Sequence, residues 1–291
     1  MDEAALPWAQ DVLRATGAPA GPAELVKDRP WSMVWRLPTP TGPVWLKACP
    51  ERTRHEVRLL SALARFDVPH VLVPLAVEED RGWVLLPDGG PTVRDVPLQP
   101  AAAQRRWADA LRAYGEVQRA TAPHADALVA LGVPDLRLPE LPTAFERLAL
   151  RWAPDLRPLL PRVRDDAAEL ADLGLPATLQ HDDLHDGNVF AAGSRPFDWG
   201  DACVGHPFAS LLVALDAAPE GPAPDPSGPA AAAYLAGWPD LPVEGLDRVL
   251  RLAVRLAVVS RADSWDRALA GWPEAPEPYR TAPADWLRRL A

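Results

Sequence analysis

One polar stretch, from Gln180 to Phe190, constrains this chain more than any other feature of its sequence. It holds three Asp, two His and one Asn between short apolar segments, and a second acidic turn, Asp198 to Asp201, follows closely. Loops carry chemistry because a rigid scaffold can direct their side chains at one point. An ordinary surface loop does not need these residue types at fixed offsets. We therefore expect the chain to fold around a polar site built from these two turns.

Phosphoryl transfer is the chemistry that this pattern favours. Asp183 would accept a proton from a substrate hydroxyl, while Asn188 and Asp198 would hold magnesium against the phosphates of a nucleotide. The spacing His-x-Asp-x-x-x-x-Asn, followed by Asp-x-Gly, is that of the catalytic and metal-binding loops of kinases. Hard oxygen ligands suit magnesium, which takes only one or two carboxylates from a protein. Two motifs thus agree in order and spacing with one mechanism.

Two other interpretations of the stretch stay open. A zinc or iron site could form from His181, His185 and an Asp, since histidines at positions i and i+4 can face one metal on a helix. Against this, Gly187 and Asn188 break a helix soon after His185, and no Glu base lies between the two histidines. The third interpretation is a polar turn without chemistry.

At residues 181–188 and 197–200 the chain resembles the aminoglycoside phosphotransferase and related small-molecule kinase family, which shares the protein-kinase-like fold. The family usually has Gly where this chain has Asp182, and often Pro where it has Asp186. Neither position is thought to bind metal or to abstract the proton in the family. The departures therefore put little of the resemblance in doubt.

The resemblance implies roles for single residues. It makes Asp183 the catalytic carboxylate, and Asn188 and Asp198 the metal ligands. It also implies that His181 supports the loop against the Asp198 turn, and that His206 is structural.

The fold that the resemblance implies is α+β and bilobal. Residues 1–88 would form a nucleotide-binding lobe with a small antiparallel sheet and one main helix, and residues 89–291 a larger, mostly helical lobe for catalysis and acceptor binding. Hydrophobic periodicity predicts helices at 6–18, 51–66, 100–120, 145–152, 163–173, 205–216, 230–237, 243–269 and 284–290. It predicts strands at 31–37, 43–48, 70–76, 82–86, 177–180, 189–191 and 195–197. Pro87 to Pro91 is suited to a hinge between the lobes.

Lys47 is the main candidate for the nucleotide phosphates. It ends an apolar strand and is one of only two lysines among 30 basic residues. The compact ammonium of lysine suits a phosphate oxygen as a point charge. Kinases direct such a lysine with a Glu on a helix, and the resemblance gives this role to Glu56, with Glu51 as its competitor.

The remaining nucleotide contacts are less defined. The turn expected over the phosphates, residues 28–33, has no glycine, and only the Ser32 hydroxyl could assist there. By resemblance, Leu85, Leu86 and Asp88 lie along the adenine ring through their backbone groups. Backbone recognition does not distinguish ATP from GTP.

Six residues in the second half are candidates for the acceptor pocket, because an aromatic ring together with a carboxylate suits a cation or a sugar face. Each can also be an ordinary residue of a helix surface or core. They are Asp216, Asp263, Trp265, Asp266, Trp272 and Glu274.

Composition limits the classes of partner. The net charge is −10, with 11 basic and 13 acidic residues up to Asp95 and 19 basic and 27 acidic residues after it. An acidic second half argues against nucleic acid. It favours cationic small molecules, although charge that serves solubility explains it equally well. Only Cys49 and Cys203 occur, no signal peptide is visible and no membrane span is expected, so we expect a cytoplasmic protein.

The sequence thus predicts an enzyme that transfers the γ-phosphoryl group of ATP, with Mg²⁺, to a hydroxyl of a small molecule. The acceptor could be an aminoglycoside or another cationic antibiotic, which would make the enzyme one of antibiotic resistance, or an amino sugar or metabolite. A kinase-shaped nucleotide-binding module without catalysis is the main alternative, and a metal-dependent hydrolase is a weaker one. Nothing in the sequence indicates an oligomeric state.

Overall fold

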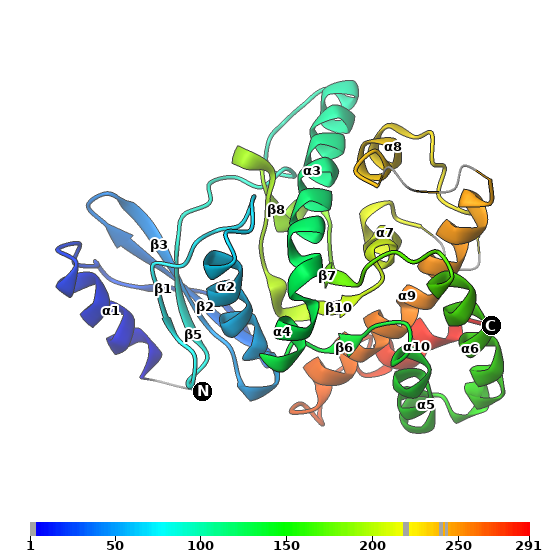
Figure 1. Cartoon of the computed structure of the whole chain (residues 1–291). Helices are drawn as coiled ribbons and strands as arrows, with labels where there is room; N and C mark the ends of the chain where they lie inside the picture. Colours follow the sequence, from blue (N-terminus) through cyan, green and yellow to red (C-terminus); the bar gives the residue numbers. More distant parts are fainter. Residues whose placement is uncertain (1–3, 218–220, 239–240, 242–243) are drawn as a thin grey trace.

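A computed structural model describes residues 4–217, 221–238, 241 and 244–291. A sheet-rich part, formed by the first third of the chain, lies beside a larger helical part (Figure 1). The α+β class predicted from the sequence is therefore confirmed, with a five-stranded sheet at the N-terminal side.

The large sheet has five antiparallel strands in the order β1-β2-β3-β5-β4. Their bounds are β1 Glu24–Arg29, β2 Ser32–Thr39, β3 Gly42–Ala48, β4 Ala76–Glu78 and β5 Trp83–Pro87. Sequence reasoning missed β1, because all six of its residues are exposed and show no apolar alternation. It also extended a strand over 70–76, of which only Ala76 is strand; His70 has a φ of 56°, which an extended strand does not allow.

Two helices cover the two faces of this sheet. Helix α1 (Ala5–Ala15) packs Ala9 and Leu13 against Leu46 and Leu85 in a small separate core. Helix α2 (His55–Arg65) lies on the other face, where its apolar side chains join the main core. Both helices occur where periodicity predicts them, so this lobe has two helices where the resemblance implied one main helix.

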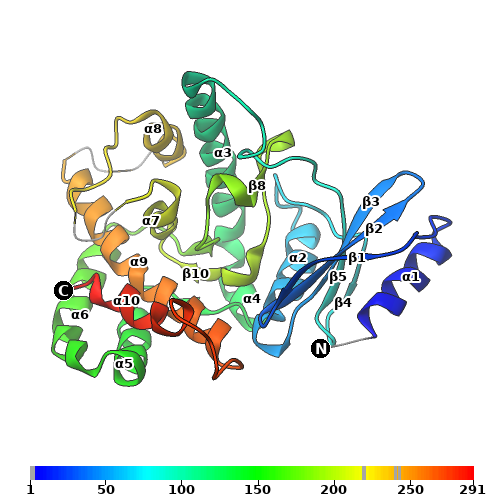
Figure 2. The same cartoon turned by 180° about the vertical axis from the view of Figure 1, so that it is seen from behind.

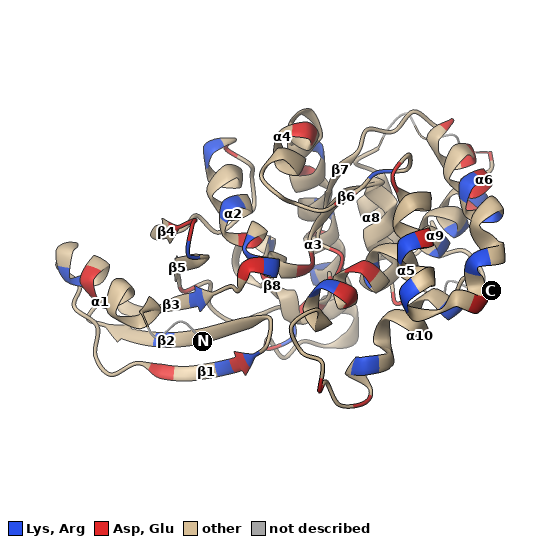
Figure 3. Cartoon of the chain, turned by 90° about the horizontal axis from the view of Figure 1, so that it is seen from below, with Lys and Arg blue, Asp and Glu red and all other residues tan. Residues whose placement is uncertain are grey.

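The second part is mostly helical. Its helices are α3 Pro100–Thr121, α4 Ala125–Ala130, α5 Leu141–Trp152, α6 Leu160–Ala171, α7 Leu211–Ala214, α8 Pro229–Leu235, α9 Leu246–Leu269 and α10 Ala282–Arg288. Figure 2 shows α10 lying against α9, and α10 also contacts α5. The helix expected over 205–216 is only the short α7 preceded by a 3₁₀ turn, and Val243, the expected start of α9, lies outside the described residues. Both signs of charge are interspersed on these helices (Figure 3).

A small sheet in the helical part positions the two polar turns. Strand β7 (Thr178–Gln180) pairs antiparallel with β10 (Cys203–Gly205), and Gln180 lies opposite Cys203. In an antiparallel pair, the end of one strand meets the start of the other. The segment after Gln180 and the segment before Cys203 therefore leave the sheet at the same end. Strands β8 (Val189–Phe190) and β9 (Arg195–Pro196) form the hairpin between the two turns.

Candidate active site

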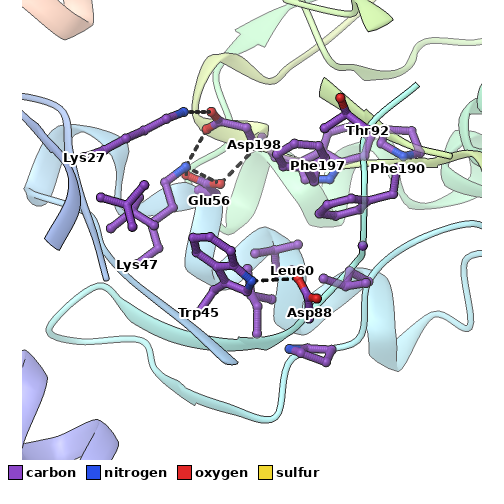
Figure 4. A pocket seen from close by; sticks show the side chains of 18 of the residues that line it. Lys27, Trp45, Lys47, Glu56, Leu60, Asp88, Thr92, Phe190, Phe197 and Asp198 are labelled. Carbon is purple, nitrogen blue, oxygen red and sulfur yellow. Dashed lines mark hydrogen bonds and ion pairs between the residues drawn. The ribbon is translucent and has the colours of Figure 1, made fainter. Parts of the chain in front are cut away.

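A buried lysine on the central strand of the large sheet, β3, lies between two carboxylates. Lys47 Nζ is 2.7 Å from Glu56 Oε2 and 2.5 Å from Asp198 Oδ1 (Figure 4). Glu56 also accepts a hydrogen bond from the backbone nitrogen of Trp199, at 3.1 Å. Glu56 thereby connects strand β3 and helix α2 to the turn that carries Asp198.

The charges of this group support one another. Burial alone would lower the pKa of Lys47, but the carboxylates of Asp198 and Glu56 raise it well above its ordinary value. The Lys47 ammonium in turn lowers the pKa of Asp198. Lys47 is therefore a cation and Asp198 an anion at neutral pH.

Asp183 lies on the other polar turn, after β7, and is held from two sides. Its Oδ1 is 3.0 Å from Arg261 Nη2, which comes from α9. The Asn188 side chain donates from Nδ2 to the Asp183 carbonyl at 3.0 Å, which closes the loop between them. His185 Nε2 is 3.7 Å from Asp183 Oδ2.

Hydrogen bonds of buried polar residues hold this loop in place. Asp182 has a φ of 64°, a left-handed conformation that explains why a glycine is common at this position in the family it resembles. Its carboxylate accepts a hydrogen bond from Ser260 Oγ at 2.6 Å, and burial raises its pKa to about 7. His181 Nε2 donates to the carbonyl of Phe197 at 2.7 Å, so it ties the two turns together, as the sequence analysis expects.

A cavity of about 350 Å³ opens between the large sheet and these turns. One end is polar, with Lys47, Glu56 and Asp198, and the rest is largely apolar, with Asp88 beside Trp45 (Figure 4). The apolar lining includes Val34, Trp45, Leu60, Leu72, Leu86, Phe190 and Phe197. Rings from opposite sides can sandwich a flat ligand, and a cleft of this size and lining is typical of a small-molecule site.

The residues predicted to contact adenine do not all face the cavity. Leu86 and Asp88 line the cavity, and Asp88 Oδ1 accepts a hydrogen bond from Trp45 Nε1 at 2.9 Å. The Leu85 side chain instead points into the core under α1, because successive residues of a strand face opposite sides. Its carbonyl is already bonded to the Leu75 nitrogen at 2.8 Å.

A second, smaller cavity of about 160 Å³ adjoins the first and shares Lys47, Glu56 and Asp198 with it. Asp183 lines this cavity together with Asp198, so the structure brings the two turns together. Ser32 lies here, on the side of Asp183, rather than in the larger cavity. The remaining lining comes largely from α9 and the β1–β2 turn and includes Trp31, Asp201, Arg261, Trp265 and Arg267.

The six acceptor candidates do not form one group. Trp265 lines the smaller cavity, and Trp272 packs against Trp31 with ring centroids 6.0 Å apart. Asp263 and Asp266 are buried and pair with arginines of α5 and α9, since Asp263 contacts Arg147 and Arg267 and Asp266 contacts Arg147 and Arg151. Asp216 lines a different hollow beside Trp107, and Glu274 is exposed on the turn after α9. Asp263 and Asp266 are thus engaged in ion pairs with arginines of α5 and α9.

Sequence reasoning missed several residues of the site. They are Lys27, Trp31, Asp201, Arg261, Arg267 and Tyr279. For Lys27 a signal was available, because it is the only lysine besides Lys47. Trp31 and Asp201 lie within turns that the sequence singles out, residues 28–33 and 198–201, but their side chains gave no separate signal. Arg261, Arg267 and Tyr279 lie far from the motifs along the chain, and only the fold brings them near.

The oxygen atoms at the two turns fit a magnesium ion. The amide nitrogen of Asn188 is bonded to Asp183, which leaves the amide oxygen to bind a cation. The carboxylate of Asp198 already attracts two ammonium groups, those of Lys47 at 2.5 Å and Lys27 at 3.8 Å. One carboxylate and one amide oxygen suit magnesium, which keeps several waters or phosphate oxygens as further ligands. Within the described residues, no three His, Cys, Asp or Glu side chains are arranged to hold a metal, as a zinc hydrolase would need.

A five-stranded antiparallel sheet, a buried Lys–Glu pair and two acidic turns across a cleft define a kinase-like phosphotransferase. The sequence model of the phosphotransferase enzyme family matches residues 26–244, and the chain belongs to this family. No curated protein gave a match to the sequence.

Solved structures share the fold along nearly the whole chain. Macrolide 2'-phosphotransferase MphH from Brachybacterium faecium is 19% identical with a TM-score of 0.57, over 94% of this chain and 99% of that one. The GDP and kanamycin complex of APH(2")-IIia is 13% identical with a TM-score of 0.61, over 98% of each chain. Choline kinase LicA from Streptococcus pneumoniae is 12% identical with a TM-score of 0.61, also over 98% of each chain. The predicted kinase-like fold is thereby confirmed.

Proposed function

We propose that this protein transfers the γ-phosphoryl group of ATP to a hydroxyl group of a small molecule. The observation that carries the proposal is the junction of two cavities at Lys47 and Asp198, with Asp183 in the lining of the smaller one only. A nucleotide in the larger cavity would direct its phosphates towards Lys47, and an acceptor in the smaller cavity would meet Asp183. Residues 1–88 would then hold the nucleotide, and residues 89–291 would supply catalysis and acceptor binding.

Each charged residue has a distinct role in this proposal. Lys47, directed by Glu56, binds phosphate oxygens, and Asp183 orients the acceptor hydroxyl and takes its proton. Asn188 and Asp198 would hold magnesium, which supplies charge neutralisation on the phosphates when bound. Arg261 fixes the orientation of Asp183. Positioning and electrostatics provide most of the rate in such reactions, because the protein makes no covalent bond to the phosphoryl group.

The nucleotide is proposed from the shape of the larger cavity. Trp45, Leu60 and Leu86 offer an apolar slot for a purine ring, next to the polar end with Lys47. A structural neighbour is described as a GDP complex, so GTP is the alternative donor to test.

The acceptor is proposed to be a hydroxylated cation. Asp183 and Asp201 line the smaller cavity, and the rings of Trp31 and Trp265 lie beside them. Aromatic rings and carboxylates together attract amines. The three solved structures named above are described as a macrolide phosphotransferase, a phosphotransferase in complex with kanamycin and a choline kinase. Aminoglycosides and other cationic antibiotics are the first candidates, which would give a role in antibiotic resistance, and amino sugars or amino alcohols come next.

The setting of the protein also enters the proposal. Both cysteines, Cys49 and Cys203, are free and buried, which fits a reducing, cytoplasmic compartment. No helix among the described residues is long and apolar enough to cross a bilayer.

A transfer assay tests the proposed function. The purified protein is incubated with Mg²⁺, with ATP or GTP, and with a panel of aminoglycosides, macrolides, amino sugars and amino alcohols. Mass spectrometry should detect the gain of one phosphoryl group on an acceptor, and chelation of magnesium should abolish it. Tight ATP binding without transfer to any acceptor would instead favour the non-catalytic nucleotide-binding module. Stoichiometric zinc in the purified protein would favour the hydrolase.

A further inference from the structure

The turn between β1 and β2 lacks the means by which kinases usually hold phosphates. Such turns are rich in glycine, so that backbone N–H groups can approach the phosphate oxygens closely. Here the turn consists of Pro30 and Trp31, between the paired residues Arg29 and Ser32. Pro30 has no N–H group. Phosphates in the larger cavity therefore need another partner on this side.

Trp31 is also committed to other contacts. Its ring centroid lies 6.1 Å from Trp265, 6.0 Å from Trp272 and 6.1 Å from Tyr279. Its carbonyl accepts a hydrogen bond from Thr53 Oγ1 at 2.9 Å. The turn is thus fixed towards the acceptor side and does not wrap over the nucleotide side.

A bulge in β1 directs Lys27 into the larger cavity. Leu25 pairs with Trp35, but after the bulge Lys27 pairs with Val34 instead of Met33. Adjacent residues of a strand face opposite sides of a sheet, so this shift moves Lys27 to the face of Val34. Val34 in turn pairs with Lys47 on the next strand. The two lysines therefore flank Val34 on one face of the sheet, and both line the larger cavity.

Both lysines of the chain meet at one carboxylate. Lys27 Nζ lies 3.8 Å from Asp198 Oδ2, and Lys47 Nζ lies 2.5 Å from Asp198 Oδ1 (Figure 4). All the other basic residues of the chain are arginines. The side chain of Lys27 is 57% exposed, and a contact of this length at such exposure contributes little to folding stability. Its ammonium is free to move to a stronger anion.

We propose that Lys27 is a second phosphate-binding lysine, which contacts the terminal phosphates of the nucleotide from the β1 side and replaces the backbone contacts of a glycine-rich turn. This rests on the proposed function. Lys27 and Lys47 then hold the phosphates from two strands, while Asp198 is released to magnesium. The contact is made to phosphate and not to the base, so it depends on the number of phosphates in the ligand.

Titration calorimetry with ATP, ADP and adenosine, each with Mg²⁺, tests this proposal. The variants are Lys27→Met, Lys27→Arg and, as a matched control on the same exposed strand, Arg29→Met. Lys27→Met should weaken ATP binding by about tenfold, the scale of one charge-assisted contact, and adenosine binding by less than about twofold. The loss of ADP affinity should lie between the losses for ATP and adenosine. Lys27→Arg should keep most of the ATP affinity, and Arg29→Met all of it.

Two results would overturn the assignment of Lys27. One is equal ATP affinity in Lys27→Met and the unchanged protein. The other is an equal loss for ATP and adenosine, which would indicate damage to the cavity rather than a lost phosphate contact. If the unchanged protein bound no nucleotide at all, the proposed function itself would fail with it. Thermal unfolding of the variants should match that of the unchanged protein, because the side chain is largely exposed.

Discussion

Arg261 Nη2 lies 3.0 Å from Oδ1 of Asp183, across an ion pair that joins helix α9 to the loop after β7. The same guanidinium donates to the carbonyl of Asp182 at 2.8 Å and to Asp201 Oδ2 at 3.3 Å. One buried arginine therefore fixes both turns of the site. Because Arg261 is buried, it contributes to folding stability as well as to the orientation of Asp183.

Replacement of Arg261 by Met should destabilise the fold by about 3–5 kcal/mol, because it removes the cation next to the buried carboxylate of Asp182 and the partly exposed carboxylates of Asp183 and Asp201. Urea unfolding measures the loss. Arg251→Met is the matched control, since Arg251 lies exposed on the same helix and should change stability by less than about 0.5 kcal/mol. Equal effects of the two substitutions would contradict this role of Arg261.

Replacement of Asp183 by Asn should lower kcat by about 10²–10⁴, the usual contribution of a general base. Nucleotide affinity should stay the same, because Asp183 lines the smaller cavity and not the larger one. Steady-state kinetics and calorimetry measure the two effects separately. Asp186→Asn, in the same loop but paired with Arg94 on the surface, is the control. Near-normal turnover in the Asp183 variant would remove that residue from the mechanism.

Replacement of Trp31 by Ala should cost about 2 kcal/mol of stability, since three aromatic contacts of about 0.5–1.5 kcal/mol each are lost from a half-buried position. It should also raise the KM for the acceptor, because Trp31 lines the smaller cavity. Trp31→Phe keeps a ring in place and should recover much of both losses. A KM for ATP that rose instead would assign the turn to the nucleotide.

His206 should make the protein sensitive to acid. Burial lowers its pKa to about 3, against an ordinary value of 6.5 in the unfolded chain. The unfolded state therefore binds one more proton between these values, and stability that is complete above pH 6.5 is lost as the pH falls. The slope is at most about 1.4 kcal/mol per pH unit for this group.

His206→Asn isolates this contribution. His206 Nδ1 accepts a hydrogen bond from the Phe208 nitrogen at 3.2 Å, and an Asn oxygen can accept in its place. Between about pH 6 and about pH 4.5, below the ordinary pKa of histidine, the free energy of unfolding should fall less steeply in the variant than in the unchanged protein. Parallel curves for the two proteins would show that His206 does not titrate on unfolding.

The two polar turns of the candidate site were predictable because their residues lie close together along the chain. Asp183, Asn188 and Asp198 fall within one short segment, so a pattern of residue types at fixed spacing indicates them without a fold. Lys47 and Glu56 lie nine residues apart on a strand and the following helix, and local periodicity is enough to place them. Strong periodicity likewise predicted α1, α2, α3 and α9.

The acceptor side was not predictable in the same way. Asp266 appeared available for a ligand, but its partners Arg147 and Arg151 come from α5, more than a hundred residues away. Ion pairs between distant helices leave no local pattern. Trp31 and Tyr279 meet from opposite ends of the chain for the same reason. The strand β1 escaped notice because an exposed edge strand needs no apolar alternation.

The contacts of Trp31 bear on how the cleft opens. A swing of the sheet about residues 87–91 would have to draw this ring away from Trp265 and Tyr279, and so expose aromatic surface to water. A glycine-rich flap moves without such a penalty. Nucleotide exchange in this protein is therefore expected to be slow, because aromatic residues of the C-terminal segment, Trp265 and Tyr279, hold the β1–β2 turn in place.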